Sequence, residues 1–222
     1  MPRDYEQTCG LARALDVVGE RWTLLIVREL LVGPRRFSDL LEGLPGIPPS
    51  LLSARLKGMQ TAGVIVKEVL PPPAASTVYR LTETGQQLEE IVLRLGRWGI
   101  RFGRKLRPTD VSRSGSLAIA LRALFQPEMR AGLDGSYELR LPDGPMRFTI
   151  DDQSLKIERG PAQNPRLVLT GRQTPVMQVL AGQLAPGEAV RRRDVKIEGD
   201  RKALNRLISA FAAQRVPQAA AT

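Results

Sequence analysis

Short polar side chains and cations recur along residues 50–57, in the stretch SLLSARLK. If this stretch is helical, the spacing of Leu52 and Leu56 places them on one inner face. The polar side chains then left on or beside the outer face are those of Ser50, Ser53, Arg55 and Lys57. Hydroxyl, guanidinium and ammonium groups hydrogen-bond to base edges and phosphates, and short side chains let a helix approach a groove closely. The pattern therefore indicates nucleic-acid recognition, and the alternative is an ordinary solvated helix face.

The elements predicted on either side of this stretch help to decide between nucleic-acid recognition and a solvated helix face. Two amphipathic helices are predicted before it, over CGLARALDVVG and WTLLIVRELLVG, followed by a short third helix with Ser38 as its N-cap. After it, two strand-like runs, VIVKEVL and TVYRLT, flank a proline-rich tip at residues 71–76. A helix beside a β-ribbon is a geometry that reads a major groove, so the order of elements favours DNA binding.

Three more arginines are candidates for contacts to the DNA backbone. Arg35 and Arg36 precede the third helix, where they would either meet a phosphate at the groove edge or lie in a solvated loop. Arg80 flanks the hairpin tip. The tip itself carries prolines, alanines and a serine but no cation, unlike a wing that inserts into a minor groove. We therefore expect the hairpin to touch only the DNA backbone, or no DNA at all.

A long apolar stripe follows Gly85. It steps by three or four residues through a helix predicted over residues 84–106, and its members include Leu88, Ile91, Leu95, Trp98 and Phe102. A helix with so long an apolar stripe must pack that stripe against another surface. The two alternatives are its own domain and a second copy of the chain.

The overall composition narrows the function classes. The 222 residues, 42% hydrophobic and 25% charged, have room for two domains of about 100 residues each. The net charge of +10 makes polyanions plausible partners. With no histidine and one cysteine, the chain excludes His-based triads, the usual zinc sites and an intrachain disulfide. We expect no catalytic site, metal or cofactor, and therefore no enzyme.

The sequence also bears on location. No apolar run approaches the roughly 18 residues that a membrane span needs, and the N-terminal residues have no signal-peptide core. We expect a cytoplasmic protein that does not associate with a membrane.

Residues 9–103 resemble the HxlR group of winged-helix transcriptional regulators, relatives of the MarR type. The resemblance rests on CGLARALDVVGERWTLLIVRELLVGPRRFSDL, LPGIPPSLLSARLKGMQTAGVI and VYRLTETG. It implies a homodimer bound to an inverted-repeat operator in double-stranded DNA, and it favours the stripe of residues 84–106 as the dimer interface. Cys9 matches the N-terminal cysteine that senses oxidants or electrophiles in some of these proteins. The alternative for Cys9 is a buried, small apolar residue.

The rest of the chain predicts an α+β domain. Residues 108–115 are typical of a linker, residues 116–213 hold a group of strands followed by alternating helices and strands, and residues 214–222 form a frayed tail. This half resembles the sterol-carrier-protein-like lipid-binding fold in its hairpins at 135–160, in PRLVL, and in LAGQLAPGEAV and VKIEGDRKALNRLISAF. The resemblance implies a lipid-like or other apolar small molecule held between sheet and helices.

Eight apolar side chains are candidates for lining such a pocket. They are those of Phe148, Ile150, Leu155, Ile157, Leu169, Met177, Leu180 and Phe211. The same side chains could close into a packed core, and the sequence leaves both alternatives open.

The combined interpretation is an α+β chain of two domains. Residues 1–107 form a winged helix-turn-helix domain for DNA binding and dimerisation, and residues 116–213 form a sterol-carrier-protein-like effector domain. An apolar ligand in the second domain would control a transcriptional regulator. One alternative is a redox or electrophile switch at Cys9 with a purely structural second domain, and another is a lipid carrier that retains a DNA-binding fold without its function.

Overall fold

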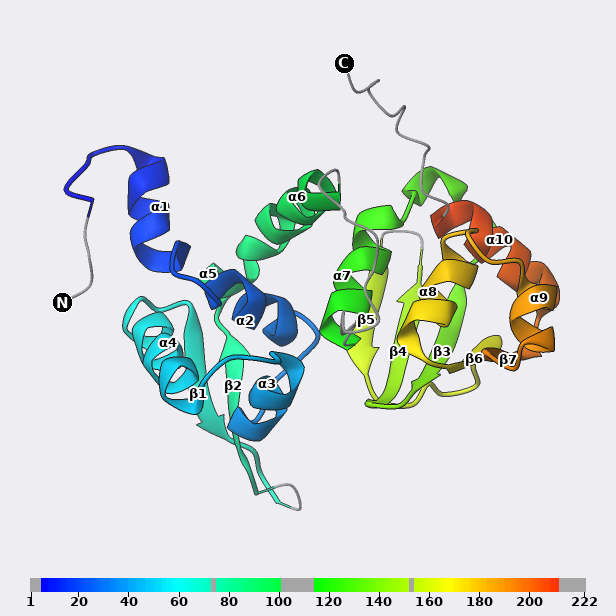
Figure 1. Cartoon of the computed structure of the whole chain (residues 1–222), viewed down its shortest axis with the longest axis horizontal. Coiled ribbons are helices and arrows are strands. Elements are labelled where there is room, and N and C mark those ends of the chain that lie inside the picture. Colours follow the sequence, from blue (N-terminus) through cyan, green and yellow to red (C-terminus); the bar gives the residue numbers. More distant parts are fainter. Residues whose placement is uncertain (1–4, 73–74, 101–113, 152–153, 212–222) are drawn as a thin grey trace. The chain divides into compact units, whose positions relative to one another are not determined.

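The computed structural model describes residues 5–72, 75–100, 114–151 and 154–211. The chain divides into two compact units, Met1–Val111 and Ser112–Thr222, which are described separately below (Figure 1). Phe102 and most of the predicted linker 108–115 lie outside the described residues, as does the predicted tail 214–222.

The first unit begins with four helices. They are α1 (Gly10–Val18), α2 (Thr23–Leu30), α3 (Phe37–Gly43) and α4 (Pro49–Thr61). Pro48 caps α4 and Pro49 occupies its first turn, where the missing N–H of a proline costs nothing. The buried side chains of these helices form one core, to which α2 contributes Ile26, Val27 and Leu30, α3 contributes Leu40, and α4 contributes Leu52, Leu56 and Met59.

The predicted N-cap of the third helix is wrong by two residues. The N-cap of α3 is Arg36, whose backbone N–H donates to the Asp39 carboxylate at 3.1 Å, while Ser38 lies inside the helix and is exposed. An acidic side chain in the first turn satisfies a helix N-terminus as well as a serine does, so the pattern allowed either start.

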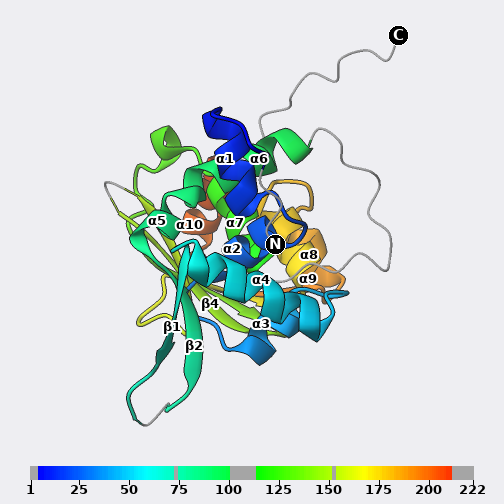
Figure 2. The ribbon, with the colours of Figure 1, turned by 90° about the vertical axis from the view of Figure 1, so that its left-hand side faces the viewer.

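An antiparallel hairpin follows α4. It consists of β1 (Ile65–Val69) and β2 (Thr77–Leu81), with Ile65 opposite Leu81. Arg35, between α2 and α3, adds an isolated bridge to Tyr79 of β2. The hairpin extends beyond the helices of its unit in both views (Figures 1 and 2). The helix-turn-helix of α3 and α4 with this hairpin is a winged helix, as predicted.

The helix predicted over residues 84–106 is divided in the structure. A short helix α5 (Glu83–Gln86) precedes α6 (Leu88–Ile100), and the Thr82 hydroxyl caps α5 by accepting a hydrogen bond from the Gly85 N–H at 3.1 Å. A Cβ atom at position 85 would overlap the carbonyl oxygen of Val64, so only glycine allows α5 to lie against the start of β1.

The second unit is built on a mixed five-stranded sheet in the order β5-β4-β3-β6-β7. The strands are β3 (Gly135–Leu141), β4 (Gly144–Ile150), β5 (Leu155–Arg159), β6 (Leu167–Gly171) and β7 (Val195–Gly199). All neighbouring pairs are antiparallel except β3 and β6, which are parallel. The predicted α+β class is confirmed.

Helices α7 (Ser114–Leu124), α8 (Gln173–Leu180) and α10 (Arg201–Phe211) cover one face of this sheet (Figure 1). A 3-10 turn, η1 (Pro127–Met129), and a short helix, α9 (Pro186–Arg191), were not predicted. Within the described residues, no helix is long and apolar enough to cross a membrane.

Candidate nucleic-acid interface

The outward face of α4 carries the small and basic side chains of the predicted reading surface. Ser50, Ser53 and Lys57 are exposed, whereas Leu52 and Leu56 are buried against the rest of the unit. In Figure 2 this helix and the neighbouring β1–β2 hairpin lie toward the viewer. The arrangement leaves hydroxyl and ammonium groups free to meet a groove, next to a hairpin that could follow the backbone.

Gly58 belongs to the same open face but was not singled out from the sequence. It lies in the second half of α4, and a Cβ atom built there would have no atom within 4 Å. A glycine inside a helix is less stable than alanine by roughly 0.5–1 kcal/mol, and packing within the unit does not require it here. Its position next to Lys57 was the available signal, because glycine allows another backbone to approach closely.

The sequence suggested that the Arg55 side chain lies free at the edge of that face. In the structure it does not. Its Nη2 is 2.6 Å from Glu20 Oε2, and its Nε donates to the Arg21 carbonyl oxygen at 3.1 Å. Both partners belong to the turn between α1 and α2. The guanidinium is therefore engaged within its own unit.

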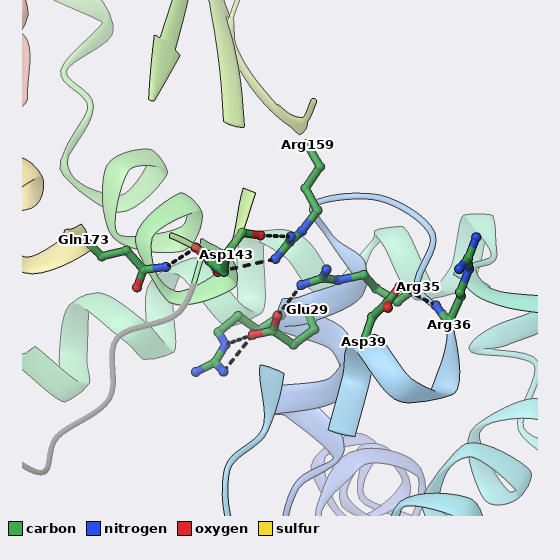
Figure 3. A network of polar contacts seen from close by, with 8 residues as sticks. Glu29, Arg35, Arg36, Asp39, Asp143, Arg159 and Gln173 are labelled. Carbon is green, nitrogen blue, oxygen red and sulfur yellow. Dashed lines mark hydrogen bonds and ion pairs between the residues drawn. The ribbon is translucent and has the colours of Figure 1, made fainter. Parts of the chain in front are cut away.

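Arg35 is buried, contrary to both of its predicted alternatives. It is 5% exposed, and its Nη2 donates to Glu29 Oε2 at 2.9 Å (Figure 3). The Glu29 carboxylate is fully buried and also accepts from Arg28 through Oε1. Neither a phosphate contact nor a solvated loop fits this placement, because Arg35 neutralises a buried carboxylate. Arg36 is exposed and remains a candidate for a phosphate contact.

Arg80 on the wing is also paired. Its Nε and Nη2 donate to the two carboxylate oxygens of Glu68 on the neighbouring strand, both at 3.1 Å. The Arg80 hydrogen bond lowers the pKa of Glu68, and the same contact raises the pKa of Arg80. The nearby Lys67 ammonium lies over the Tyr79 ring, 5.9 Å from its centroid. Cations on the hairpin are thus partly satisfied by hairpin residues.

The apolar stripe of α6 is only partly covered. Val92 is buried and Leu88 half-buried, but Ile91 is 54%, Leu95 45% and Trp98 55% exposed. Helix α1 likewise exposes Leu11 and Leu15. Exposed large apolar side chains therefore occur on both α1 and α6.

Cys9 is the N-cap of α1 and is exposed, so the alternative of a buried small residue is wrong. The backbone N–H groups of Ala12 and Leu11, at the start of α1, lower the pKa of its thiol. A lower pKa raises the fraction of thiolate, the nucleophilic form of cysteine.

The eight candidate pocket residues of the second unit lie between sheet and helices. Six are buried, and Leu155 and Met177 are half-buried. The Phe148 ring stacks on Tyr137 with centroids 4.9 Å apart and meets Phe211 edge-on at 6.1 Å. The Tyr137 hydroxyl donates to the Leu133 carbonyl at 2.6 Å, and burial raises the pKa of Tyr137. Because these rings contact one another, a ligand among them would have to part them.

A polar cluster at one end of the sheet was not anticipated. Gln173 is 6% exposed and donates through Nε2 to Asp143 Oδ1 at 2.9 Å (Figure 3). Arg159 donates to the Asp143 carbonyl oxygen at 3.2 Å. These contacts join the β3–β4 turn to the end of β5 and the start of α8. No group of acidic, histidine or cysteine side chains suited to a metal ion occurs within the described residues.

Comparison with known proteins assigns each half of the chain to a family. Residues 17–107 match the model of the HxlR-like helix-turn-helix family, and residues 118–212 match the SCP-2 sterol transfer family.

Individual relatives match the first half. The uncharacterized HTH-type transcriptional regulator YvaP of Bacillus subtilis is 36% identical over 90 residues, which are 40% of this chain and 83% of that protein. The HTH-type transcriptional regulator YodB of the same species is 33% identical over 89 residues, 40% of this chain and 80% of that protein. The solved structure of the redox regulator HypR in its oxidized form matches with 30% identity and a TM-score of 0.40, over 44% of this chain and 100% of that one. The chain thus belongs to the HxlR-like helix-turn-helix family of transcriptional regulators and carries an SCP-2 domain in its second half.

Proposed function

We propose that the protein is a sequence-specific, DNA-binding transcriptional regulator whose α4 enters the major groove. The observation that carries this proposal is the outward face of α4, where Ser50, Ser53 and Lys57 are exposed beside the β1–β2 hairpin. Arg36, also exposed, supplies a phosphate contact at the groove edge. Arg35, Arg55 and Arg80 are engaged by Glu29, Glu20 and Glu68, so we leave them out of the free reading surface.

Selection of binding sites from random double-stranded DNA by the full chain tests this function. We expect enrichment of an inverted repeat whose affinity falls steeply with salt, by a log–log slope of about −0.9 for each neutralised phosphate. Absence of any enriched sequence, with weak binding to all DNA alike, would contradict the proposal and favour the lipid-carrier alternative.

The regulator acts as a homodimer in the cytoplasm. Two copies of α4 must lie about 34 Å apart to reach successive major grooves on one side of the duplex, and that requires a dimer. The exposed Ile91, Leu95 and Trp98 of α6 supply an apolar surface for it. The functional division is residues 1–107 for DNA binding and dimerisation, 108–115 as a linker, 116–213 as an effector domain and 214–222 as a tail.

An apolar small molecule bound by the second unit controls DNA binding. The support is the match of residues 118–212 to the SCP-2 sterol transfer family, together with an interior lined by aromatic and aliphatic side chains. Native mass spectrometry of the purified chain, followed by denaturing extraction, tests it. A dimer that carries a lipid-like mass supports the proposal. A dimer that stays empty, and binds none of a panel of fatty acids and sterols, contradicts it and leaves the aromatic cluster as a packed core.

A second candidate is a thiol switch at Cys9, with the second unit only structural. The observation in its favour is the exposed thiol at the N-terminus of α1, whose pKa is lowered. Treatment with peroxide or a quinone should then release DNA from the wild type but not from Cys9→Ser. Release that persists in Cys9→Ser would exclude this mechanism.

A further inference from the structure

The Arg55 side chain links the proposed recognition helix to the turn between α1 and α2. Nη2 makes a 2.6 Å ion pair with Glu20, and Nε binds the Arg21 carbonyl oxygen at 3.1 Å. The arginine side chain is 23% exposed and the Glu20 side chain 55% exposed. Because one of the two acceptors is a main-chain carbonyl, the contact fixes the backbone of the turn as well as its side chain.

That turn has a well-defined conformation of its own. Trp22, the N-cap of α2, adopts a left-handed backbone conformation with φ of 83°, which is unfavourable for an aromatic residue and persists only where its surroundings determine it. The Thr23 N–H closes the turn on the Glu20 carbonyl at 3.1 Å. The Arg21 guanidinium also lies over the Trp22 ring, 5.4 Å from its centroid. The turn is therefore a rigid support for the side chain that reaches it.

The same turn also lies near the start of the recognition helix. The Trp22 ring lies beside Gly46, where a built Cβ atom would be 4.0 Å from Cη2. Gly46 precedes α4, and Arg55 lies in the middle of that helix. Arg55 therefore ties the middle of α4 to the turn, and the Trp22 ring lies near the segment that precedes the helix.

The place of Arg55 on α4 also favours positioning over reading. It follows Leu52 by three residues and precedes Met59 by four, and both of these are buried. Residues three and four apart share a helix face, so Arg55 borders the buried side, away from Ser53 and Lys57. To contact a phosphate it would have to give up both Glu20 and the Arg21 carbonyl.

We propose that Arg55 is a positioning residue, which holds α4 through Glu20 and Arg21 at the angle where Ser50, Ser53 and Lys57 face the groove, without itself touching DNA. This inference rests on the proposed function. The sequence suggested that the Arg55 guanidinium contacts DNA. The proposed role is instead to orient the helix that reads the groove.

A double-mutant cycle on the full chain tests the inference, with the DNA site selected by the wild type and affinity measured across a range of salt. The variants are Glu20→Gln, Arg55→Gln and the combination of both. We expect each single change to weaken binding by roughly threefold to thirtyfold, and the double change to be no worse than either alone, because the two residues act as one unit. The salt slope should stay that of the wild type in all three.

A direct phosphate contact by Arg55 gives the opposite pattern and would overturn the inference. Arg55→Gln would then reduce the salt slope by about 0.9, while Glu20→Gln, by freeing the guanidinium, would leave affinity unchanged or raise it. Unchanged affinity in both single variants would overturn it as well. Thermal melting checks the folding of all three variants, and we expect each to fold because the pair lies at the surface.

Lys57→Gln is the matched control, since Lys57 is exposed on the reading face of the same helix. It should lower the salt slope by about 0.9, as loss of one phosphate contact does. If the wild type selects no site, the proposed function fails. If it selects a site and Lys57→Gln behaves as stated while the cycle does not, only the role of Arg55 fails.

Discussion

At the scale of single residues, Glu29 explains why Arg35, in the loop before α3, is not free to contact DNA. Its carboxylate lies without solvent exposure between Arg28 and Arg35, each of which donates at 2.9 Å. Arg35 also exchanges backbone hydrogen bonds with Tyr79, at 2.9 and 2.7 Å. The ion pair therefore ties α2 to the wing. A cation that serves a buried carboxylate cannot leave it for a phosphate without a large desolvation cost.

Replacing Glu29 by glutamine should therefore destabilise the first unit strongly. The change leaves the Arg35 guanidinium buried without a counter-charge, for which we expect a loss of about 3–5 kcal/mol in the free energy of unfolding. Urea denaturation measures it. Glu68→Gln, which breaks the partly exposed pair with Arg80, is the control and should cost far less, because solvent screens a pair near the surface. Equal losses in the two variants would contradict the structural role given to Glu29.

Gly58 offers a test in which stability and function move in opposite directions. Gly58→Ala should stabilise the protein by about 0.5–1 kcal/mol, since alanine has the higher helix propensity and its methyl group meets no atom of the chain. The same methyl group should weaken DNA binding if the backbone of α4 approaches the groove closely there. Thermal melting measures the change in stability, and a DNA-binding titration on the same sample measures the change in affinity. A more stable variant with unchanged affinity would place the DNA away from position 58.

The residues that were misjudged from the sequence share one physical reason. Ser50, Ser53 and Lys57 could be placed because the period of a helix fixes which side chains point outward. The partners of Arg35 and Arg55 come from other elements, and no periodicity within one helix reveals them. One signal was available for Glu29, which follows Ile26 by three residues and so lies on the apolar face of α2. A charged residue in that place requires a partner.

At the scale of elements, α6 separates a buried side from an exposed apolar side. Its buried Val92 and half-buried Leu88 face the rest of the unit, and Ile91, Leu95 and Trp98 remain exposed. In a protein that associates through this face, a charge there should act on association with little effect on folding.

Leu95→Glu should accordingly yield a folded monomer at concentrations where the wild type is dimeric. Sedimentation velocity reports the mass, and circular dichroism reports the helix content. Val69→Glu is the control, because Val69 is an exposed apolar residue of the hairpin outside the proposed interface. A dimer that survives Leu95→Glu would move the interface away from α6.

The start of α10 depends on Asp200. Hydrogen bonds from the backbone N–H of Ala203, from Arg166 and from the N–H of Lys202 lower the pKa of Asp200 from its ordinary value of 3.8. Arg166 also donates to the Gly132 and Asp134 carbonyl oxygens, at 3.1 and 2.8 Å. Asp200 thus joins a helix cap to a loop that precedes β3.

The stability that Asp200 contributes should depend on pH in a defined direction. A carboxyl whose pKa is lower in the folded protein stabilises it above the unfolded value of 3.8, and the contribution is lost as pH falls through the folded pKa. Asp200→Asn should therefore be less stable than the wild type at pH 7, and the gap should close below pH 3.8. Urea denaturation at pH 7 and in acid checks this. A gap of constant size would mean that the charge contributes nothing.

Long periodic elements were predictable and short ones were not. Helices such as α4 and α10 and the strands β1 to β5 could be located from hydrophobic period and turn residues. Helices α5 and α9 span four and six residues, too few for a period to show. The order of the sheet was not predicted either, because the parallel pairing of β3 with β6 joins strands far apart in the sequence.

At the scale of the whole molecule, residues 17–107 match the HxlR-like helix-turn-helix family and residues 118–212 match the SCP-2 sterol transfer family. Control of one by the other requires that the ligand bind the DNA-competent and incompetent states with different affinity. The coupling is reciprocal. A ligand recovered from the protein that lowers DNA affinity tenfold must itself bind tenfold more weakly to the DNA complex, which calorimetric titration with and without DNA measures. Equal ligand affinity in both titrations would exclude control through binding equilibrium.

Site-directed DNA cleavage tests whether α4 reads the groove. Because Cys9 is the one cysteine of the chain, Ser53→Cys in a Cys9→Ser background provides a single thiol on the reading face, to which an iron chelate can be attached. On the selected site, we expect cleavage at two symmetric positions about one helical turn apart, centred on the half-sites. Attachment at Glu128→Cys in the second unit, in the same background, provides the comparison. If the labelled protein binds the site but the label at position 53 does not cleave at the half-sites, α4 does not lie in the groove.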